Sequence, residues 1–179
     1  MRETSRLITM KRLKGQAALV TGANSGIGEA VAKALSVEGA HVVVNYVANE
    51  AEAQRVVQEI RKDNGTALAL YADVSKEGDM KNMFNEMYEC FGTIDILVNN
   101  AGMQRDAPFI EMKLEEWRSV IDVNLTGSFL CAREAAKEFI RKGVGSKGSL
   151  SSGKIVFISS VHEVIPWARH CNYAASKGA

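Results

Sequence analysis

The chain has 179 residues, of which 46% are hydrophobic and 24% are charged, and its formal net charge is +1. This composition is typical of one soluble globular domain with a single core. Because 22 basic residues nearly balance 21 acidic ones, the charge gives no reason to expect nucleic acid or an anionic membrane as partner, and a small molecule is expected instead.

The N-terminal segment is basic but has no continuous apolar stretch of signal-peptide length. We expect residues 1–14 to form a loose tail, and Met10 is an alternative start of the protein. No later run approaches the roughly 20 apolar residues that a membrane-spanning helix needs. With no internal repeat and no composition break, residues 1–179 are expected to form a single domain.

Short apolar runs rich in β-formers alternate along the chain with longer amphipathic runs. The expected strands are residues 17–21, 41–45, 67–71, 95–98 and 154–159. The expected helices are residues 26–37, 50–63, 76–91 and 114–142, and a Gly- and Ser-rich loop is expected over 143–153. This order predicts an α/β fold with a doubly wound parallel sheet covered by helices on both faces, as three α/β/α layers.

The three cysteines, Cys90, Cys131 and Cys171, are widely spaced and odd in number. They show none of the paired spacings of metal or redox motifs, so reduced thiols and a cytoplasmic location are expected. Histidines and carboxylates do not cluster with metal-ligand spacing either, and we expect no metal.

A glycine loop, Thr21-Gly22-Ala23-Asn24-Ser25-Gly26-Ile27-Gly28, follows the first expected strand and opens the first helix. Glycines there let the backbone turn tightly and approach a pyrophosphate at the helix N-terminus. The spacing differs from the usual Gly-x-Gly-x-x-Gly fingerprint. Taken alone, the loop is equally consistent with a simple strand-to-helix turn.

Tyr173 and Lys177 stand four residues apart in an expected helix, and therefore on one face of it. An ammonium group beside a phenol favours the ionised form, which makes the phenol a usable proton donor or acceptor. This pair indicates redox chemistry on a nicotinamide cofactor.

Two further motifs follow the fourth and fifth expected strands: Asn99-Asn100-Ala101-Gly102 and Ser159-Ser160. With the glycine loop and the Tyr/Lys pair, they give four motifs in an order that resembles the short-chain dehydrogenase/reductase family, from residue 13 to residue 179. The resemblance implies a Rossmann fold. Family members continue with further strands and a substrate-covering segment, so we expect a fold truncated after the fifth strand, with its C-terminal part missing.

The resemblance implies four catalytic residues. Tyr173 would be the general acid/base, and Lys177 would assist it and hold the nicotinamide ribose. Ser160 would hydrogen-bond the substrate oxygen, and Asn124 would support a proton relay through water near the lysine. Each also has an ordinary structural interpretation: a buried tyrosine with a bonded hydroxyl, a serine cap, or an amide that bonds backbone.

The resemblance also implies the cofactor site. Besides Tyr173 and Lys177, the matching positions lie in the glycine loop and after the third and fourth strands: Gly22, Ser25, Gly26, Ile27, Gly28, Asp73, Val74, Asn100, Ala101 and Gly102. No carboxylate follows the second strand, which ends in Asn45-Tyr46-Val47, and no basic residue stands at Asn24, Ser25 or Val47. The sequence therefore permits NAD or NADP.

Within the family, the run Ser159-Ser160-Val161-His162-Glu163 and the pair Asn45-Tyr46 look like the glucose 1-dehydrogenase subgroup. This implies oxidation of a sugar hydroxyl, with Ser160, His162 and Tyr173 at the substrate, although His162 and Glu163 are also consistent with a capped surface loop. The resemblance further suggests a homotetramer. The alternatives are a 3-oxoacyl carrier-protein reductase-like carbonyl reductase and a non-catalytic dinucleotide-binding fragment.

Overall fold

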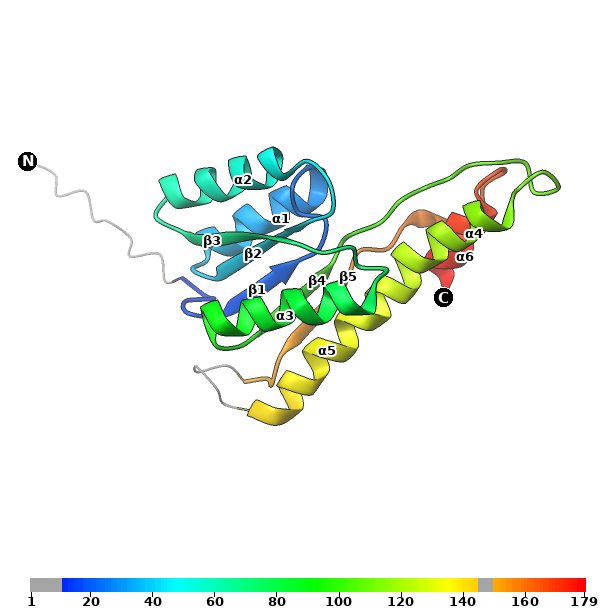
Figure 1. Cartoon of the computed structure of the whole chain (residues 1–179). Coiled ribbons are helices and arrows are strands. Elements are labelled where there is room, and N and C mark those ends of the chain that lie inside the picture. The colour runs from blue at the N-terminus through cyan, green and yellow to red at the C-terminus, as the bar shows by residue number, and fades with distance from the viewer. Residues whose placement is uncertain (1–10, 145–149) are drawn as a thin grey trace, which may run out of the picture.

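The computed structural model describes residues 11–144 and 150–179, and it contains one parallel sheet with the strand order β3-β2-β1-β4-β5 (Figure 1). The strands lie within one or two residues of the expected positions: β1 (Ala17–Val20), β2 (His41–Tyr46), β3 (Thr66–Tyr71), β4 (Ile96–Asn99) and β5 (Lys154–Phe157). Every neighbouring pair is parallel. The predicted doubly wound α/β fold is confirmed.

Helices connect the strands, and their bounds are α1 (Gly26–Val37), α2 (Glu50–Lys62), α3 (Glu77–Phe91), α4 (Leu114–Ile121), α5 (Gly127–Lys142) and α6 (Cys171–Gly178). The sequence predicted a single helix over residues 114–142. The structure instead has α4 and α5 joined by a π-helical segment, Asp122–Thr126. A π-segment closes i→i+5 hydrogen bonds over only about one turn, which is too short for hydrophobic periodicity to reveal it.

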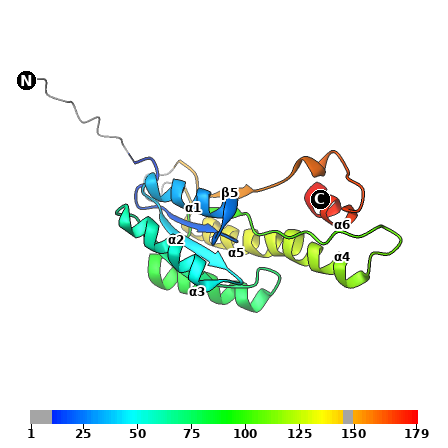
Figure 2. The ribbon, with the colours of Figure 1, turned by 90° about the horizontal axis from the view of Figure 1, so that it is seen from above.

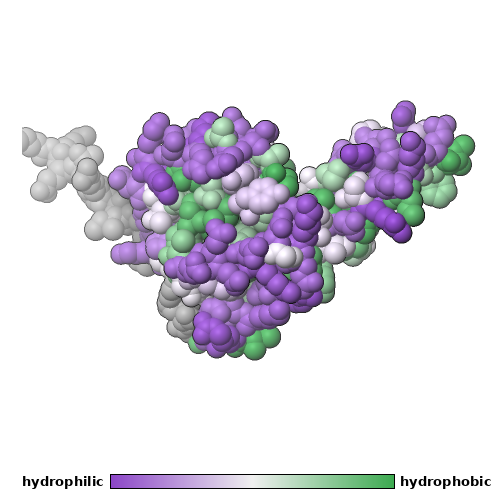
Figure 3. Space-filling model, in the orientation of Figure 1, coloured by the Kyte–Doolittle hydropathy of each residue, from purple (hydrophilic) through white to green (hydrophobic). Residues whose placement is uncertain are grey.

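Each face of the sheet has its own buried core because successive side chains of a strand point to opposite faces. Ala18, Val20 and Val42 face the layer of α1 and α2. Leu19 and Val43 face the layer of α3 and α5. Figure 3 shows the apolar residues gathered between these layers, with hydrophilic residues over the outer helix surfaces. The α3 side chains that fill the second core are Met80, Met83, Phe84 and Met87.

The strand order reverses at β1, which lies between β2 and β4. In open α/β sheets, ligands bind outside the carboxyl ends of the strands at such a reversal. The α4 and α6 helices project beyond those ends, away from the body of the sheet (Figures 1 and 2). In the sheet of the described residues, β3 and β5 are the two edge strands; on β5, Val156 and Phe157 are 45% and 56% exposed.

The end of the predicted loose tail is ordered, which corrects that prediction for residues 11–14. The Leu13 amide donates to the Glu38 carbonyl, Arg12 pairs with the Glu38 carboxylate at 2.9 Å, and Leu13 packs on the core of the α1/α2 face. The backbone contacts are formed by a turn, which the basic composition of this segment does not indicate. Residues 1–10, and residues 145–149 of the predicted loop, lie outside the described residues.

Candidate functional site

The glycine loop connects the carboxyl end of β1 to the first turn of α1, as its sequence predicted. Gly22 and Gly26 have φ angles of +59° and +57°, which favour glycine. Gly28 is required for a different reason: a Cβ atom there would lie 2.5 Å from both the Asn100 Nδ2 and the Gly22 carbonyl oxygen. The loop therefore needs its glycines for conformation at two positions and for close approach at the third.

Side chains of neighbouring strands hold the loop in place. Asn100 Nδ2 donates to the carbonyl oxygens of Thr21 and Gly22, at 2.9 and 3.0 Å. Thr21 Oγ1 accepts from the amides of Asn100 and Ala101. Thr21 was not among the predicted site residues, although its place at the end of a strand beside the loop is a signal for such a role. Asn100 is thus bonded to the loop itself.

A cavity of about 470 Å³ opens between the glycine loop and the ends of β2, β3 and β4. Most of the predicted cofactor residues line it: Gly22, Ser25, Gly26, Ile27, Asp73, Val74, Asn100, Ala101 and Gly102. Gly28 lies behind the loop and is buried. A backbone-lined hollow at a helix N-terminus, with a glycine where any Cβ would collide, fits the pyrophosphate of a dinucleotide.

Of the described residues that line this cavity, Asp73 is the one that carries a charge. Its Oδ1 accepts from the amide and hydroxyl of Ser75, at 3.0 and 2.6 Å, and its Oδ2 lies 3.4 Å from Lys76 Nζ. Burial alone would raise the pKa of Asp73, but the bonds from Ser75 and Lys76 hold it below its usual value. The group is therefore an ionised acceptor fixed at the cavity wall.

A second cavity, of about 340 Å³, adjoins the first and shares Ile27, Asn100, Gly102 and Met103 with it. Its other walls include Gln104, Ile158 and Ser159, together with Tyr173 and Lys177 of α6. The structure thus brings the predicted proton-transfer pair and the glycine loop to one continuous hollow. These elements are far apart in sequence and meet only through the fold.

Tyr173 and Lys177 lie one turn apart on α6, with Lys177 Nζ 5.8 Å from the centre of the Tyr173 ring. Lys177 Nζ donates to the Ile158 carbonyl oxygen at 2.8 Å, which fixes the amine over the end of β5. Burial lowers the pKa of Lys177, because the charged form loses hydration. The amine therefore lies at the site in a partly desolvated position.

Asn124 is buried in the π-helical segment, and its amide reaches in two directions. Its Oδ1 accepts from the Met103 amide at 2.8 Å, while its Nδ2 donates to the Met103 carbonyl and to Ser176 Oγ, at 3.0 and 2.9 Å. Ser176 Oγ donates in turn to the Tyr173 carbonyl oxygen at 2.8 Å. Asn124 thus connects the loop after β4 to the helix that carries Tyr173.

The predicted serine has a different position from its neighbour. Ser160 Oγ accepts from the His162 amide at 3.2 Å and caps a short 3₁₀ turn, whereas Ser159 lines the cavity with Tyr173. The His162 ring lies 6.3 Å from the Tyr173 ring, edge to face. Glu163 bonds Ser159 Oγ and lines an adjoining cavity of about 500 Å³. Of His162 and Glu163, it is His162 whose side chain lies beside the Tyr173 ring.

A clasp of two loops, not anticipated from the sequence, holds the start of α6. His170 Nε2 lies 3.1 Å from Asp106 Oδ2, and the His170 ring stacks on Trp167 with centroids 4.1 Å apart. Asn172, which is completely buried, donates through Nδ2 to the Arg105 carbonyl and accepts the Tyr173 amide at its Oδ1, at 2.7 Å each. The position of Tyr173 therefore depends on the loop after β4.

Two features are absent from residues 11–144 and 150–179. None of the helices there combines the length and apolar character needed to cross a bilayer. Within the same ranges, three or more His, Cys, Asp or Glu side chains never gather in a way that could hold a metal ion. The three cysteines are free thiols, with Cys131 buried and Cys90 exposed.

Comparison with protein families matches residues 16–179 to the model described as short chain dehydrogenase. The 3beta-hydroxysteroid dehydrogenase 1 of Eggerthella lenta is 42% identical over 165 residues, which are 92% of this chain and 60% of that protein. The 3-oxoacyl-[acyl-carrier-protein] reductase of Synechocystis sp. is 41% identical over 168 residues, 94% of this chain and 65% of that protein.

Solved structures show the same likeness in three dimensions. A dehydrogenase/reductase from Sinorhizobium meliloti 1021 superimposes with a TM-score of 0.86 at 36% identity, over 95% of this chain and 64% of that one. A gluconate 5-dehydrogenase from Burkholderia cenocepacia J2315, in complex with NADP and tartrate, gives a TM-score of 0.83 at 35% identity, over 95% and 63%. The chain thus spans about three fifths of the length of these relatives.

Proposed function

Because the chain belongs to the short chain dehydrogenase family, we propose that it transfers a hydride between a nicotinamide dinucleotide and an alcohol or carbonyl substrate. The single observation that carries the proposal is the shared cavity. Tyr173 and Lys177 of α6 line it together with Ile27 of the glycine loop and Gly102 after β4. A proton-transfer group and a dinucleotide site thus open into one hollow, as this reaction requires.

The residues that would hold the cofactor are those of the first cavity. The loop of Gly22 to Gly28 would hold the pyrophosphate, Asp73 and Val74 the adenine, and Gly102 and Lys177 the nicotinamide ribose; these residues line the two cavities, apart from Gly28 behind the loop. When bound, the cofactor would supply or accept the hydride. The two cavities share four lining residues, as one extended ligand would require.

The proton is handled by this chain's own residues. In oxidation, the Tyr173 oxygen takes the proton of the substrate hydroxyl, and in reduction it returns that proton to the carbonyl oxygen. Such a transfer by a positioned side chain contributes about 10²–10⁴-fold in rate. Lys177 Nζ lies 5.8 Å from the centre of the Tyr173 ring, where it would assist this transfer. Asn124 and Ser176 hold the helix turn that presents Tyr173.

A serine hydroxyl would bind the substrate oxygen. Ser160 is the proposed residue, with the family resemblance as its support; its hydroxyl accepts from the His162 amide. Ser159 already lines the cavity, but its hydroxyl is bonded to Glu163. Alanine substitutions at each position, compared by kcat/KM, separate the two roles.

For the substrate we propose a sugar or related polyol, as in glucose 1-dehydrogenase. The support is His162, a polar ring beside Tyr173, in a motif that resembles that subgroup. A site built on hydrogen bonds to hydroxyls rejects analogues that lack them. A second candidate is the reduction of a 3-oxoacyl thioester, which the 41% identity to the Synechocystis reductase favours.

The decisive experiment follows reduced cofactor by its absorbance at 340 nm with a panel of aldoses, gluconate, hydroxysteroids and a 3-oxoacyl thioester. We expect turnover with at least one alcohol or carbonyl compound, and loss of turnover in Tyr173→Phe with cofactor binding retained. Cofactor binding without turnover on the whole panel would support the alternative of a non-catalytic dinucleotide-binding protein.

We further propose a homo-oligomer, tetrameric as in the family resemblance, and a cytoplasmic location. Exposed apolar side chains on the α4 and α5 surface, including Trp117 and Phe129 at 36% and 55% exposure, support a subunit contact. The free thiols support a reducing compartment. Light scattering after size-exclusion chromatography measures the subunit number directly.

A further inference from the structure

The wall of the dinucleotide cavity at the end of β2 determines what can surround the adenosine ribose. Dinucleotide folds place a carboxylate there for the ribose diol, or a basic residue for a 2′-phosphate. Here the positions are Asn45 and Val47, across from Asn24 of the glycine loop. This wall of the cavity therefore contains neither of the usual charged groups.

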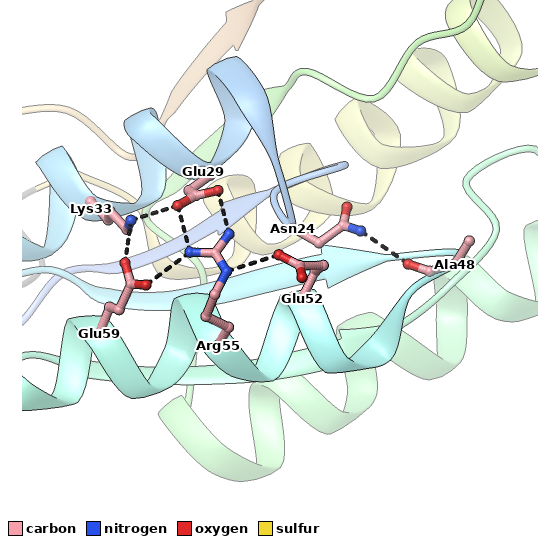
Figure 4. A network of polar contacts seen from close by, with 7 residues as sticks. All are labelled: Asn24, Glu29, Lys33, Ala48, Glu52, Arg55 and Glu59. Carbon is pink, nitrogen blue, oxygen red and sulfur yellow. Dashed lines mark hydrogen bonds and ion pairs between the residues drawn. The ribbon is translucent and has the colours of Figure 1, made fainter.

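The two asparagine amides at this wall are already oriented by protein contacts. Asn45 Oδ1 accepts from the Gly22 amide at 3.1 Å, and its Nδ2 donates to the Ala72 carbonyl at 3.1 Å. Asn24 Nδ2 donates to the Ala48 carbonyl at 3.0 Å (Figure 4). Asn45 Nδ2 is thus bonded to backbone carbonyls, and one N–H of Asn24 Nδ2 is bonded to Ala48. These neutral amides bring no positive charge to a phosphate, whereas the Asn24 carbonyl is an acceptor suited to a ribose hydroxyl.

Three cations of the elements around this cavity, Arg55, Lys33 and Lys76, are paired with carboxylates. Arg55 contacts three of them, Glu29, Glu52 and Glu59, at 2.8 to 3.0 Å (Figure 4). Lys33 lies between Glu29 and Glu59 in the same network. Across the cavity, Lys76 is paired with Asp73. Of the described residues that line the cavity, none is basic.

The charge that does lie near the end of β2 is negative. Helix α2 begins three residues after Val47, and its first turn carries Glu50 and Glu52. These carboxylates offset the positive end of the helix dipole, which would otherwise attract a phosphate. Burial and then Glu50 raise the pKa of Tyr46, which places the Glu50 charge beside this end of the strand. Asp73 adds a further negative charge at the cavity wall.

We infer that this cavity discriminates against the 2′-phosphate, so that the chain binds NAD(H) more tightly than NADP(H), with Val47 as the residue that determines the preference. The inference rests on the proposed function and specifies its cofactor. A dianionic phosphate at this wall would lose water, meet acceptor oxygens and carboxylates, and gain no cation. A ribose diol, with its two O–H donors, finds the Asn24 carbonyl instead.

The test is a calorimetric titration of the 179-residue chain with NADH and with NADPH at low and moderate salt. We expect NADH to bind about tenfold or more tightly than NADPH, because the 2′-phosphate finds no charge-assisted hydrogen bond at this wall, and one such bond is worth about that ratio. Val47 is 57% exposed and has room for a longer side chain. Val47→Arg should therefore tighten NADPH binding about tenfold or more, with a larger effect at low salt.

The matched control is Val47→Gln, which lengthens the side chain without adding charge and should leave the NADPH affinity within about threefold of the wild type. Equal or tighter binding of NADPH by the wild type would overturn the inference while leaving the proposed function intact. An unchanged NADPH affinity in Val47→Arg would refute the role of Val47. If neither cofactor binds, the proposed function fails and takes this inference with it.

Discussion

Lys177 stands over the end of β5 with its amine bonded to the Ile158 carbonyl oxygen at 2.8 Å, one helical turn from Tyr173. The bond holds a partly buried ammonium group in the wall of the cavity that Tyr173 also lines. Three elements meet there: the residue after β5 supplies the acceptor, α6 supplies the side chain, and Ile27 of the glycine loop lines the same cavity. The Lys177 charge therefore has two opposite effects: it would assist proton transfer at Tyr173, but its partial burial disfavours the folded state.

Substitution of Lys177 by methionine removes this charge and tests its two effects separately. We expect kcat/KM for the oxidoreductase reaction to fall at least about 10²-fold, because loss of a group that assists proton transfer typically has an effect of that size. Lys177→Arg, which keeps the charge, serves as the control and should retain more activity than the methionine variant. Retention of wild-type kcat/KM by Lys177→Met would remove Lys177 from the mechanism.

The same methionine variant should be at least as stable as the wild type near pH 7. Burial lowers the pKa of Lys177 from 10.5, so the unfolded chain binds more protons than the folded one between the lowered pKa and 10.5. Wild-type stability should therefore rise, relative to the variant, as the pH increases through that window. Urea unfolding of both proteins from pH 7 to pH 10.5 measures the difference, and a decrease over the window would contradict it.

Gly28→Ala should destabilise the glycine loop. Its Cβ would lie 2.5 Å from Asn100 Nδ2 and from the Gly22 carbonyl, and relief of such overpacking costs about 1–3 kcal/mol. We also expect weaker cofactor binding. Gly78→Ala is the matched control, because a Cβ on this α3 residue meets nothing within 4 Å; its stability should be unchanged or up to about 1 kcal/mol higher. Equal thermal midpoints for the two variants would contradict the close approach.

Asn172→Ala should loosen the start of α6. It removes a completely buried side chain and leaves the Arg105 carbonyl and the Tyr173 amide without this partner, which costs about 1–3 kcal/mol. Because Tyr173 directly follows, kcat should fall along with stability. Asn82→Ala on the exposed surface of α3 is the control. Should chemical denaturation give Asn172→Ala and Asn82→Ala the same free energy of unfolding, the clasp has no role in stability.

Glu29→Gln should weaken the link between α1 and α2 in a pH-dependent manner. Hydrogen bonds from Arg55 and then Lys33 lower the pKa of Glu29 from 4.5 to about 2. A depressed carboxyl pKa stabilises the fold above pH 4.5, and this contribution is lost as the pH falls toward 2. The wild type should exceed the variant in stability at pH 7, and the gap should narrow from pH 4.5 downward.

The measurement for Glu29 is urea unfolding at a series of pH values, with Glu89→Gln as the control, since Glu89 is an exposed carboxylate of α3. The control should show no comparable narrowing. A gap between wild type and Glu29→Gln that stays constant from pH 6 to pH 3 would mean that the network in Figure 4 does not form in solution.

Periodicity predicted the elements because β1, β2 and β4 are largely buried apolar runs and the helices have amphipathic patterns. Helix α1 has the predicted bounds, and the other helix and strand ends, apart from the divided helix at 114–142, lie within two residues of the predicted ones. The glycine loop and the Tyr173/Lys177 pair were found because motif spacing is local. The clasp of His170 with Asp106 and of Asn172 with Arg105 joins residues more than 60 positions apart, and nothing in the sequence specifies such contacts. Likewise, Ser159 and Ser160 are alike in sequence, and only the three-dimensional structure distinguishes them.

The wide turn at Asp122–Thr126 has a consequence for the whole layer beneath it. If these residues rewound into ordinary α-helix, one residue of register would be gained, and everything after them would rotate by about 100°. Leu130, Cys131 and Phe139 would then swing out of the core that they share with α3. The packing of α5 in this core therefore stabilises the π-helical turn that places Asn124 against Met103 and Ser176. A core substitution in α5 that removes a methyl group should thus alter the position of Asn124 and of the helix that carries Tyr173.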